Sequence, residues 1–72
     1  MSAENIREEH LMIGDLVQSR FYIDAGDESV ERGAVGIVVG FSLFHDFVVD
    51  FENGQSYTRL SVDVSDIEAV SS

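Results

Sequence analysis

The side chains of this chain that could do chemistry are carboxylates and two histidines, and their spacing limits what they can do. His45 and Asp46 are neighbours, but neighbouring side chains in extended backbone point apart, so they form no ready acid–base dyad. Asp50 and Glu52 stand two positions apart, which in a strand separates their side chains by about 6.6 Å. That distance overlaps the geometry of an inverting glycosidase, but a chain of 72 residues leaves no room for a sugar-sized pocket. The sequence predicts a protein that is not an enzyme.

Acidic clusters are also the candidate metal ligands. One cluster is Glu8-Glu9-His10, and the other comprises Asp24, Asp27 and Glu28. The second cluster lacks the alternating ligands and the closing glutamate of a calcium loop. The chain has no cysteine, which excludes disulfides and thiolate zinc sites. We therefore expect neither a metal nor a cofactor.

Charge is the strongest compositional signal. Fourteen Asp and Glu residues stand against four arginines, with no lysine, and the formal net charge is −10. Such a surface repels the phosphates of nucleic acids and anionic membranes, so direct binding to either is not expected. A basic protein is the complementary partner, because opposite potentials accelerate association. Two alternatives stay open, since acidity also serves solubility and is typical of proteins from salt-adapted hosts.

Length and composition indicate one small domain of 72 residues. The N-terminus lacks the basic and apolar pattern of a signal peptide. The longest apolar run, 35–41, is far shorter than a membrane span. We expect a cytoplasmic monomer. Residues 1–12 are polar without a clear amphipathic face, which predicts a short flexible tail before a domain that covers 13–72.

Alternating apolar and polar residues predict an all-β domain with five strands, near 15–23, 34–41, 46–52, 55–64 and 67–70. Asn53-Gly54 predicts a hairpin turn of type I′, and 24–33 reads as a long acidic loop. Glycines 36 and 40 indicate a bulge or a tight bend. The residues predicted to face the core are Val17, Phe21, Ile23, Val35, Ile37, Val39, Phe41, Phe47, Val49, Phe51, Leu60, Val62, Val64 and Ile67.

This order of elements, with a long first loop, a central meander and a one-turn break before the last strand, resembles the five-stranded SH3-like barrel. The segments that carry the resemblance are Ile13–Val17, Arg32–Gly40, Val49–Phe51 and Ile67–Val70.

Three families of such small barrels carry similar motifs. The CarS-type antirepressors, acidic proteins that imitate operator DNA, have a strand entry similar to Ile13–Val17 and a Gly-Ile-Val-Val-Gly run similar to 36–40. The nitrogenase accessory Z-type family has an Arg-Gly-x-x-Gly core that resembles 32–36. Photosynthetic barrels that serve ferredoxin complexes have a Phe-Glu-x-Gly turn and a late acidic pair that resemble 51–54 and 67–68.

The predicted partner-binding site is a row of carboxylates, the acidic row, formed by Asp46, Asp50 and Glu52 on the outward face of one strand. Their spacing resembles that of phosphates along a nucleic-acid strand, although outward strand positions are polar in any barrel. Asp63 is expected to extend the row from the next strand, and Tyr57, Arg59 and Phe44 are expected to act as anchors beside it.

The acidic row and the CarS-type resemblance together predict an inhibitor or antirepressor that occupies the DNA-binding surface of a basic regulator. The alternative is an accessory or assembly subunit that docks onto a redox or metallocluster enzyme complex, as the other two families imply.

Overall fold

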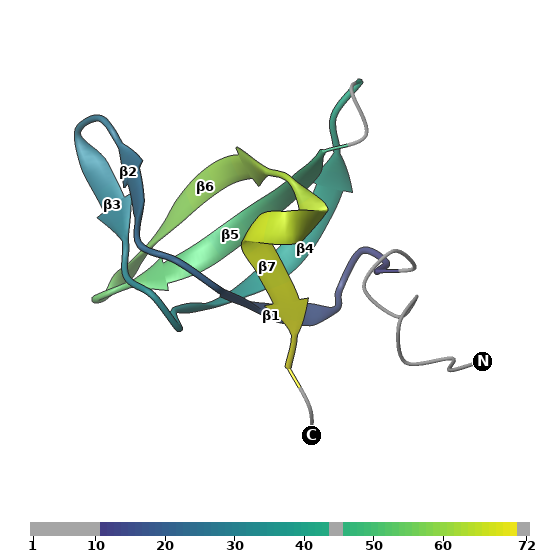
Figure 1. Ribbon diagram of the computed structural model, residues 1–72, viewed down its shortest axis with the longest axis horizontal. Coiled ribbons are helices and arrows are strands. Elements are labelled where there is room, and N and C mark those ends of the chain that lie inside the picture. Colours follow the sequence, from purple (N-terminus) through teal and green to yellow (C-terminus); the bar gives the residue numbers. More distant parts are fainter. Residues whose placement is uncertain (1–10, 44–45, 71–72) are drawn as a thin grey trace.

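The computed structural model describes residues 11–43 and 46–70, which form seven strands and a single turn of 3₁₀ helix (Figure 1). The prediction of an all-β fold is confirmed. A five-stranded antiparallel sheet has the order β6-β5-β4-β1-β7, and a separate hairpin pairs β2 with β3. The bounds are β1 Leu16–Ser19, β2 Ile23–Ala25, β3 Glu28–Val30, β4 Val35–Phe41, β5 Phe47–Asn53, β6 Ser56–Val62, η3 Val64–Asp66 and β7 Ile67–Ala69.

Strands β4, β5 and β6 follow one another in the chain as a meander. The turn between β5 and β6 consists of Gly54 and Gln55, because Asn53 pairs with Ser56. Gly54 has a φ of 67°, a left-handed conformation that glycine adopts without a steric penalty. The predicted hairpin is confirmed, but its centre lies one residue later than Asn53-Gly54. This shift changes each cross-strand partner by two positions and leaves the two faces of the strands unchanged.

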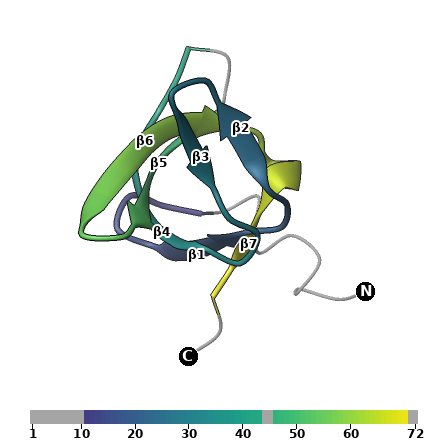
Figure 2. The ribbon, with the colours of Figure 1, turned by 90° about the vertical axis from the view of Figure 1, so that its left-hand side faces the viewer.

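Strand β1 lies in the sheet between β4, the first strand of the meander, and β7, the last strand of the chain. Val17 lies between Gly36 of β4 and Ala69 of β7. The turn η3 carries the chain from β6 into β7, and its N-cap is Asp63, whose side chain accepts a hydrogen bond from the Ser65 N–H. Figure 2 shows that the sheet curves strongly and that the β2–β3 hairpin lies across its open side. Strand β3 contacts β5 and β6 there.

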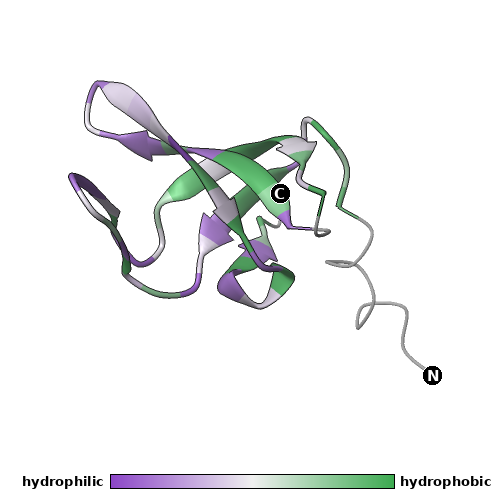
Figure 3. Cartoon of the chain, turned by 90° about the horizontal axis from the view of Figure 1, so that it is seen from above, coloured by the Kyte–Doolittle hydropathy of each residue, from purple (hydrophilic) through white to green (hydrophobic). Residues whose placement is uncertain are grey.

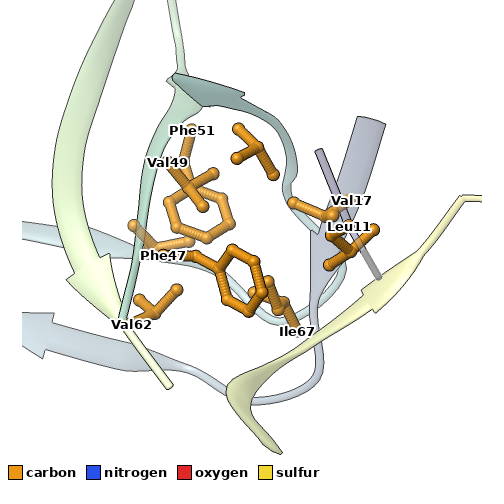
Figure 4. Packing of buried hydrophobic residues seen from close by; sticks show 9 residues of the cluster. Leu11, Val17, Phe47, Val49, Phe51, Val62 and Ile67 are labelled. Atoms are coloured by element: carbon orange, nitrogen blue, oxygen red, sulfur yellow. The ribbon is translucent and has the colours of Figure 1, made fainter. Parts of the chain in front are cut away.

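The curved sheet and the hairpin enclose one hydrophobic core, whose side chains converge in Figure 4. Phe47, Val49 and Phe51 face this core from β5, as predicted. Val30 and Leu11 also belong to it, although neither was in the predicted set. Residues 1–10 lie outside the described residues, so the boundary between tail and domain stays a prediction. The core comprises Leu11, Val17, Val30, Val38, Phe47, Val49, Phe51, Val62 and Ile67.

The predicted inward face of β4 is wrong before the bulge, where Val38 is fully buried and Ile37 is 40% exposed. After the bulge, Phe41 is exposed, but it pairs with buried Phe47 and the two ring centroids lie 5.4 Å apart, so it shares the core side. The cause of the difference before the bulge is Gly36, which faces the core, since a Cβ at this position would lie 2.6 Å from Val49 Cγ1 and 2.9 Å from Phe51 Cδ1. With Gly36 inward, its neighbours Val35 and Ile37 must face outward. The predicted bulge is confirmed, because the pairing register shifts between Val38 and Gly40.

Two further predictions change at the end of β1. Phe21, predicted in the core, is 57% exposed, because β1 ends at Ser19 and the alternation ends with it. Ser19 is buried, and its hydroxyl donates a hydrogen bond to the Phe21 carbonyl at 2.5 Å. The predicted acidic loop contains the β2–β3 hairpin, in which Ile23 pairs with Val30. Gly26-Asp27 is therefore a second tight turn.

Candidate protein-binding surface

The acidic row lies along β5 on the side away from the core. Asp50 and Glu52 alternate with buried Val49 and Phe51, so their side chains face outward. Asp46 immediately precedes the strand, and its N–H donates a hydrogen bond to Ser42 Oγ at 3.2 Å. Because their neighbours Val49 and Phe51 are fixed in the core, Asp50 and Glu52 both lie on the outer face of β5.

Asp50 is not a free carboxylate, because it is paired with Arg59 directly across β5 and β6. Arg59 Nε lies 2.7 Å from Asp50 Oδ1, and Arg59 Nη2 lies 3.0 Å from Oδ2. This two-point geometry suits the planar guanidinium. The hydrogen bond from Arg59 lowers the pKa of the Asp50 carboxyl, and the same contact raises the pKa of Arg59. Arg59, predicted as an anchor beside the row, thus compensates the charge at its middle.

The two other members of the row, Asp46 and Glu52, differ from Asp50 in their ion pairing. Within 11–43 and 46–70, neither Asp46 nor Glu52 forms an ion pair. Glu52 is exposed and lies opposite Tyr57, which is exposed beside it as the prediction required. Among the residues that the structure describes, the row therefore has carboxylates without a counter-ion at its two ends and an ion pair between them.

Asp63, predicted to extend the row, is engaged by the turn that follows β6. Its Oδ2 accepts hydrogen bonds from Ser65 N at 3.3 Å and from Ser65 Oγ at 2.7 Å. These bonds, the side-chain one first, lower the pKa of the Asp63 carboxyl. The Asp63 carboxylate thus caps η3 and does not extend the acidic row. Phe44, the last predicted anchor, lies outside the described residues, as do His45 and the Glu8-Glu9-His10 cluster.

A shallow pocket of about 330 Å³ opens at the end of β1. Arg20 is held on its wall, because Nε donates to the Ile67 carbonyl at 2.9 Å and Nη1 lies 3.6 Å from Glu68 Oε1. Gln18 also donates to Glu68. These contacts tie β1 to β7, and the lining pairs no nucleophile with a base. The lining residues are Gln18, Ser19, Arg20, Phe21, Arg32, Gly33 and Glu68.

Exposed apolar side chains lie next to the acidic row, and the sequence reasoning missed them. Leu16 of β1 pairs with Ile37 of β4, and Ile37 pairs in turn with Asp50. Leu16 is 48% exposed. The signal was present, because every residue of β4 other than glycine is apolar, so either face of that strand had to be apolar. Figure 3 shows hydrophobic colouring over much of the strands and hydrophilic colouring at the hairpin ends.

The described residues contain no group of three or more histidine, aspartate and glutamate side chains arranged to hold a metal ion. They also form no helix long and apolar enough to cross a membrane. No protein-family model, curated protein or solved structure matches the chain.

Proposed function

We propose that the protein is a non-enzymatic binding module that occupies the DNA-binding surface of a basic protein, in the manner of an antirepressor. The observation that carries this proposal is the alternation along β5, where outward Asp50 and Glu52 follow inward Val49 and Phe51. Charges on a strand fixed by its own core keep a spacing of about 6.6 Å. A helix that binds phosphates meets carboxylates along one strand here, and Asp50 joins Asp46 and Glu52 as a free carboxylate only when Arg59 is displaced from it.

The proposal includes a finer statement about the fold, namely that the two sheets together make one closed SH3-like barrel. Three features support it. The five-stranded sheet curves strongly (Figure 2), β1 bridges the meander and the last strand, and β3 contacts β5 and β6. A barrel of this kind presents the outer face of β5 on a convex surface, where a partner helix can reach it.

In this proposal the Asp50–Arg59 pair contributes specificity more than affinity. An arginine of the partner takes the place of Arg59 on Asp50 and makes the same two-point contact. One ion pair then replaces another, so the net gain at Asp50 is small. Asp46 and Glu52 supply the attraction, because within the described part of the chain they have no counter-ion to lose.

The test begins with capture of proteins from an extract of the native host, followed by elution with short duplex DNA at constant ionic strength. We expect a basic DNA-binding protein that the duplex releases, because DNA and the acidic row compete for one surface. Binding should also weaken steeply with salt. A captured protein that duplex DNA does not release contradicts the imitation of DNA. A captured protein that carries a metal cluster would instead support an accessory subunit.

Two matched double variants distinguish the effect of the acidic row on binding from the effect of net charge. Asp46→Lys with Glu52→Lys should abolish capture of the partner. Asp27→Lys with Glu28→Lys changes the net charge by the same amount at the β2–β3 hairpin and should retain most of it. Equal loss in both double variants would show that only the overall charge matters.

A further inference from the structure

The acidic row borders a contiguous apolar surface. Leu16, Ile37 and Asp50 lie side by side on β1, β4 and β5, and all three side chains face outward. Val35 lies two residues before Ile37, and Val48 lies two residues before Asp50, so both share this face. We call these four aliphatic residues, Leu16, Val35, Ile37 and Val48, the outer apolar patch.

Single exposed hydrophobic residues are normal on protein surfaces, but this patch is continuous across three strands. Strands that are apolar on both faces are typical of sheets covered on both sides. In β4 the inner face is covered by the core, through Gly36 and Val38, while Ile37 on the outer face remains 40% exposed. The composition of β4 thus fits a strand whose outer face is covered when the protein is bound.

Charge decides what can cover the patch. A second copy of this chain also carries a net charge of −10, and face-to-face contact would bring two acidic rows together. An anionic membrane is disfavoured for the same reason. A partner with an apolar centre and cationic side chains beside it satisfies both features, since neighbouring strands are only about 4.8 Å apart. Asp50 and Glu52 then receive the cations while the patch receives the apolar side chains.

We propose that the outer apolar patch binds the apolar face of a basic amphipathic helix of the partner, laid along β4, with the arginines or lysines of the helix on the acidic row. This inference rests on the proposed function and adds the part of the partner that is recognised. It gives the interface a buried apolar centre and a charged rim, which is the usual anatomy of a specific interface.

The experiment uses the full chain and three synthetic helical peptides of equal length, followed by NMR of backbone amides and methyl groups. The first peptide has a leucine face flanked by arginines. The second keeps every arginine and replaces each leucine by glutamine, and the third keeps every leucine and replaces each arginine by glutamine. We expect the first peptide to bind at least tenfold more tightly than either of the others, with methyl shifts at Leu16, Val35 and Ile37.

Two variants locate the effect. Ile37→Gln should reduce binding of the first peptide to the level of the second, without changing binding of the second. Leu43→Gln makes the same kind of change at a side chain that is 94% exposed outside the patch, and should leave all three affinities unchanged. Circular dichroism checks that both variants are folded, and the methyl shifts of the unsubstituted protein give a readout that needs no variant.

The outcomes separate this inference from the proposed function. Equal binding of the first two peptides would overturn the role of the patch and leave the acidic row as the binding site. Equal binding of the first and third would overturn a basic occupant. Failure of both arginine-bearing peptides to bind would overturn the proposed function as well.

Discussion

At the scale of single residues, the pairing of Asp50 with Arg59 changes the role expected of each side chain in binding. Sequence reasoning placed Asp50 in the acidic row and Arg59 beside it as an anchor, but it did not place them in contact. The reason is the turn. With its centre at Asn53-Gly54, the hairpin would set Asp50 opposite Tyr57, whereas the observed turn at Gly54-Gln55 sets it opposite Arg59. A shift of one residue in the turn thus decides whether Arg59 is an anchor for a partner or the counter-ion of Asp50.

The pair predicts a measurable titration. Arg59→Gln removes the guanidinium, so the pKa of Asp50 should rise from its lowered value toward the ordinary 3.8. Arg32→Gln makes the same change in net charge at an exposed arginine that forms no ion pair among the described residues, and it should leave the pKa of Asp50 nearly unchanged. Carboxyl carbon shifts followed from pH 2 to 6 give both values. An identical response in the two variants would show that the two-point contact does not persist in solution.

At the scale of elements, the two glycines of β4 have opposite roles. Gly36→Ala places a methyl group within 2.9 Å of Phe51 Cδ1 and of the Asp50 carbonyl, where the backbone cannot yield. We expect a loss of stability of about 1–3 kcal/mol, which is typical of an overpacked core. Gly40→Ala meets nothing within 4 Å and should change stability little. Urea denaturation of both variants tests this contrast, and equal losses would contradict the inward position of Gly36.

The η3 cap should make stability depend on pH in a predictable direction. The pKa of Asp63 is lowered in the folded state by its bonds to Ser65, so the ionised carboxylate favours folding. That contribution is complete above the ordinary pKa of 3.8 and is lost as the pH falls through the lowered folded-state value. Asp63→Ala should therefore lower the melting temperature at pH 7, and the difference from the unsubstituted protein should shrink below about pH 4. Thermal melts at several pH values check the prediction, and a difference independent of pH would contradict it.

The elements also show what a sequence can and cannot predict. The faces of β5 were predictable, because buried Val49 and Phe51 alternate there with acidic Asp50 and Glu52. The faces of β4 were not predictable, because every residue other than glycine is apolar. The inward face is set by Gly36, whose lack of a side chain leaves room for Val49 and Phe51. The β2–β3 hairpin had a signal that was overlooked, since Ile23 and Val30 flank Gly26-Asp27 symmetrically. The outer apolar patch became apparent only once Gly36 was placed inward and Ile37 outward on β4.

At the scale of the whole molecule, a core of few side chains makes each one important. Phe51 is fully buried at its centre, and Phe51→Ala should cost about 3–5 kcal/mol through the cavity it leaves. Small domains have only about 5–15 kcal/mol in total, so this variant should lose a large share of its stability and denature at a much lower denaturant concentration. Phe21→Ala is the control, because the Phe21 ring is mostly exposed. Denaturation curves that coincide for the two variants would contradict the placement of Phe51.

Net charge should also be visible in the stability of the molecule. A formal charge of −10 on 72 residues creates repulsion that added salt screens. We expect the melting temperature to rise with sodium chloride between 0.05 and 1 M, because the screening length falls from above 10 Å to about 3 Å over that range. Asp27→Lys with Glu28→Lys removes part of the repulsion and should flatten the rise. An equally steep rise in the double variant would indicate a salt effect unrelated to charge repulsion.

The pairing of β1 with β7 sets the response of the protein to mechanical force. The two strands are antiparallel, and the Val70 N–H donates to the Leu16 carbonyl at 3.0 Å, so the chain enters β1 and leaves β7 at the same end of the sheet. Tension applied through the two ends of the chain therefore loads these hydrogen bonds one after another, as in opening a zipper, instead of shearing them all together. The molecule should give way at low force, beginning at β7, while the β4–β5–β6 meander stays paired.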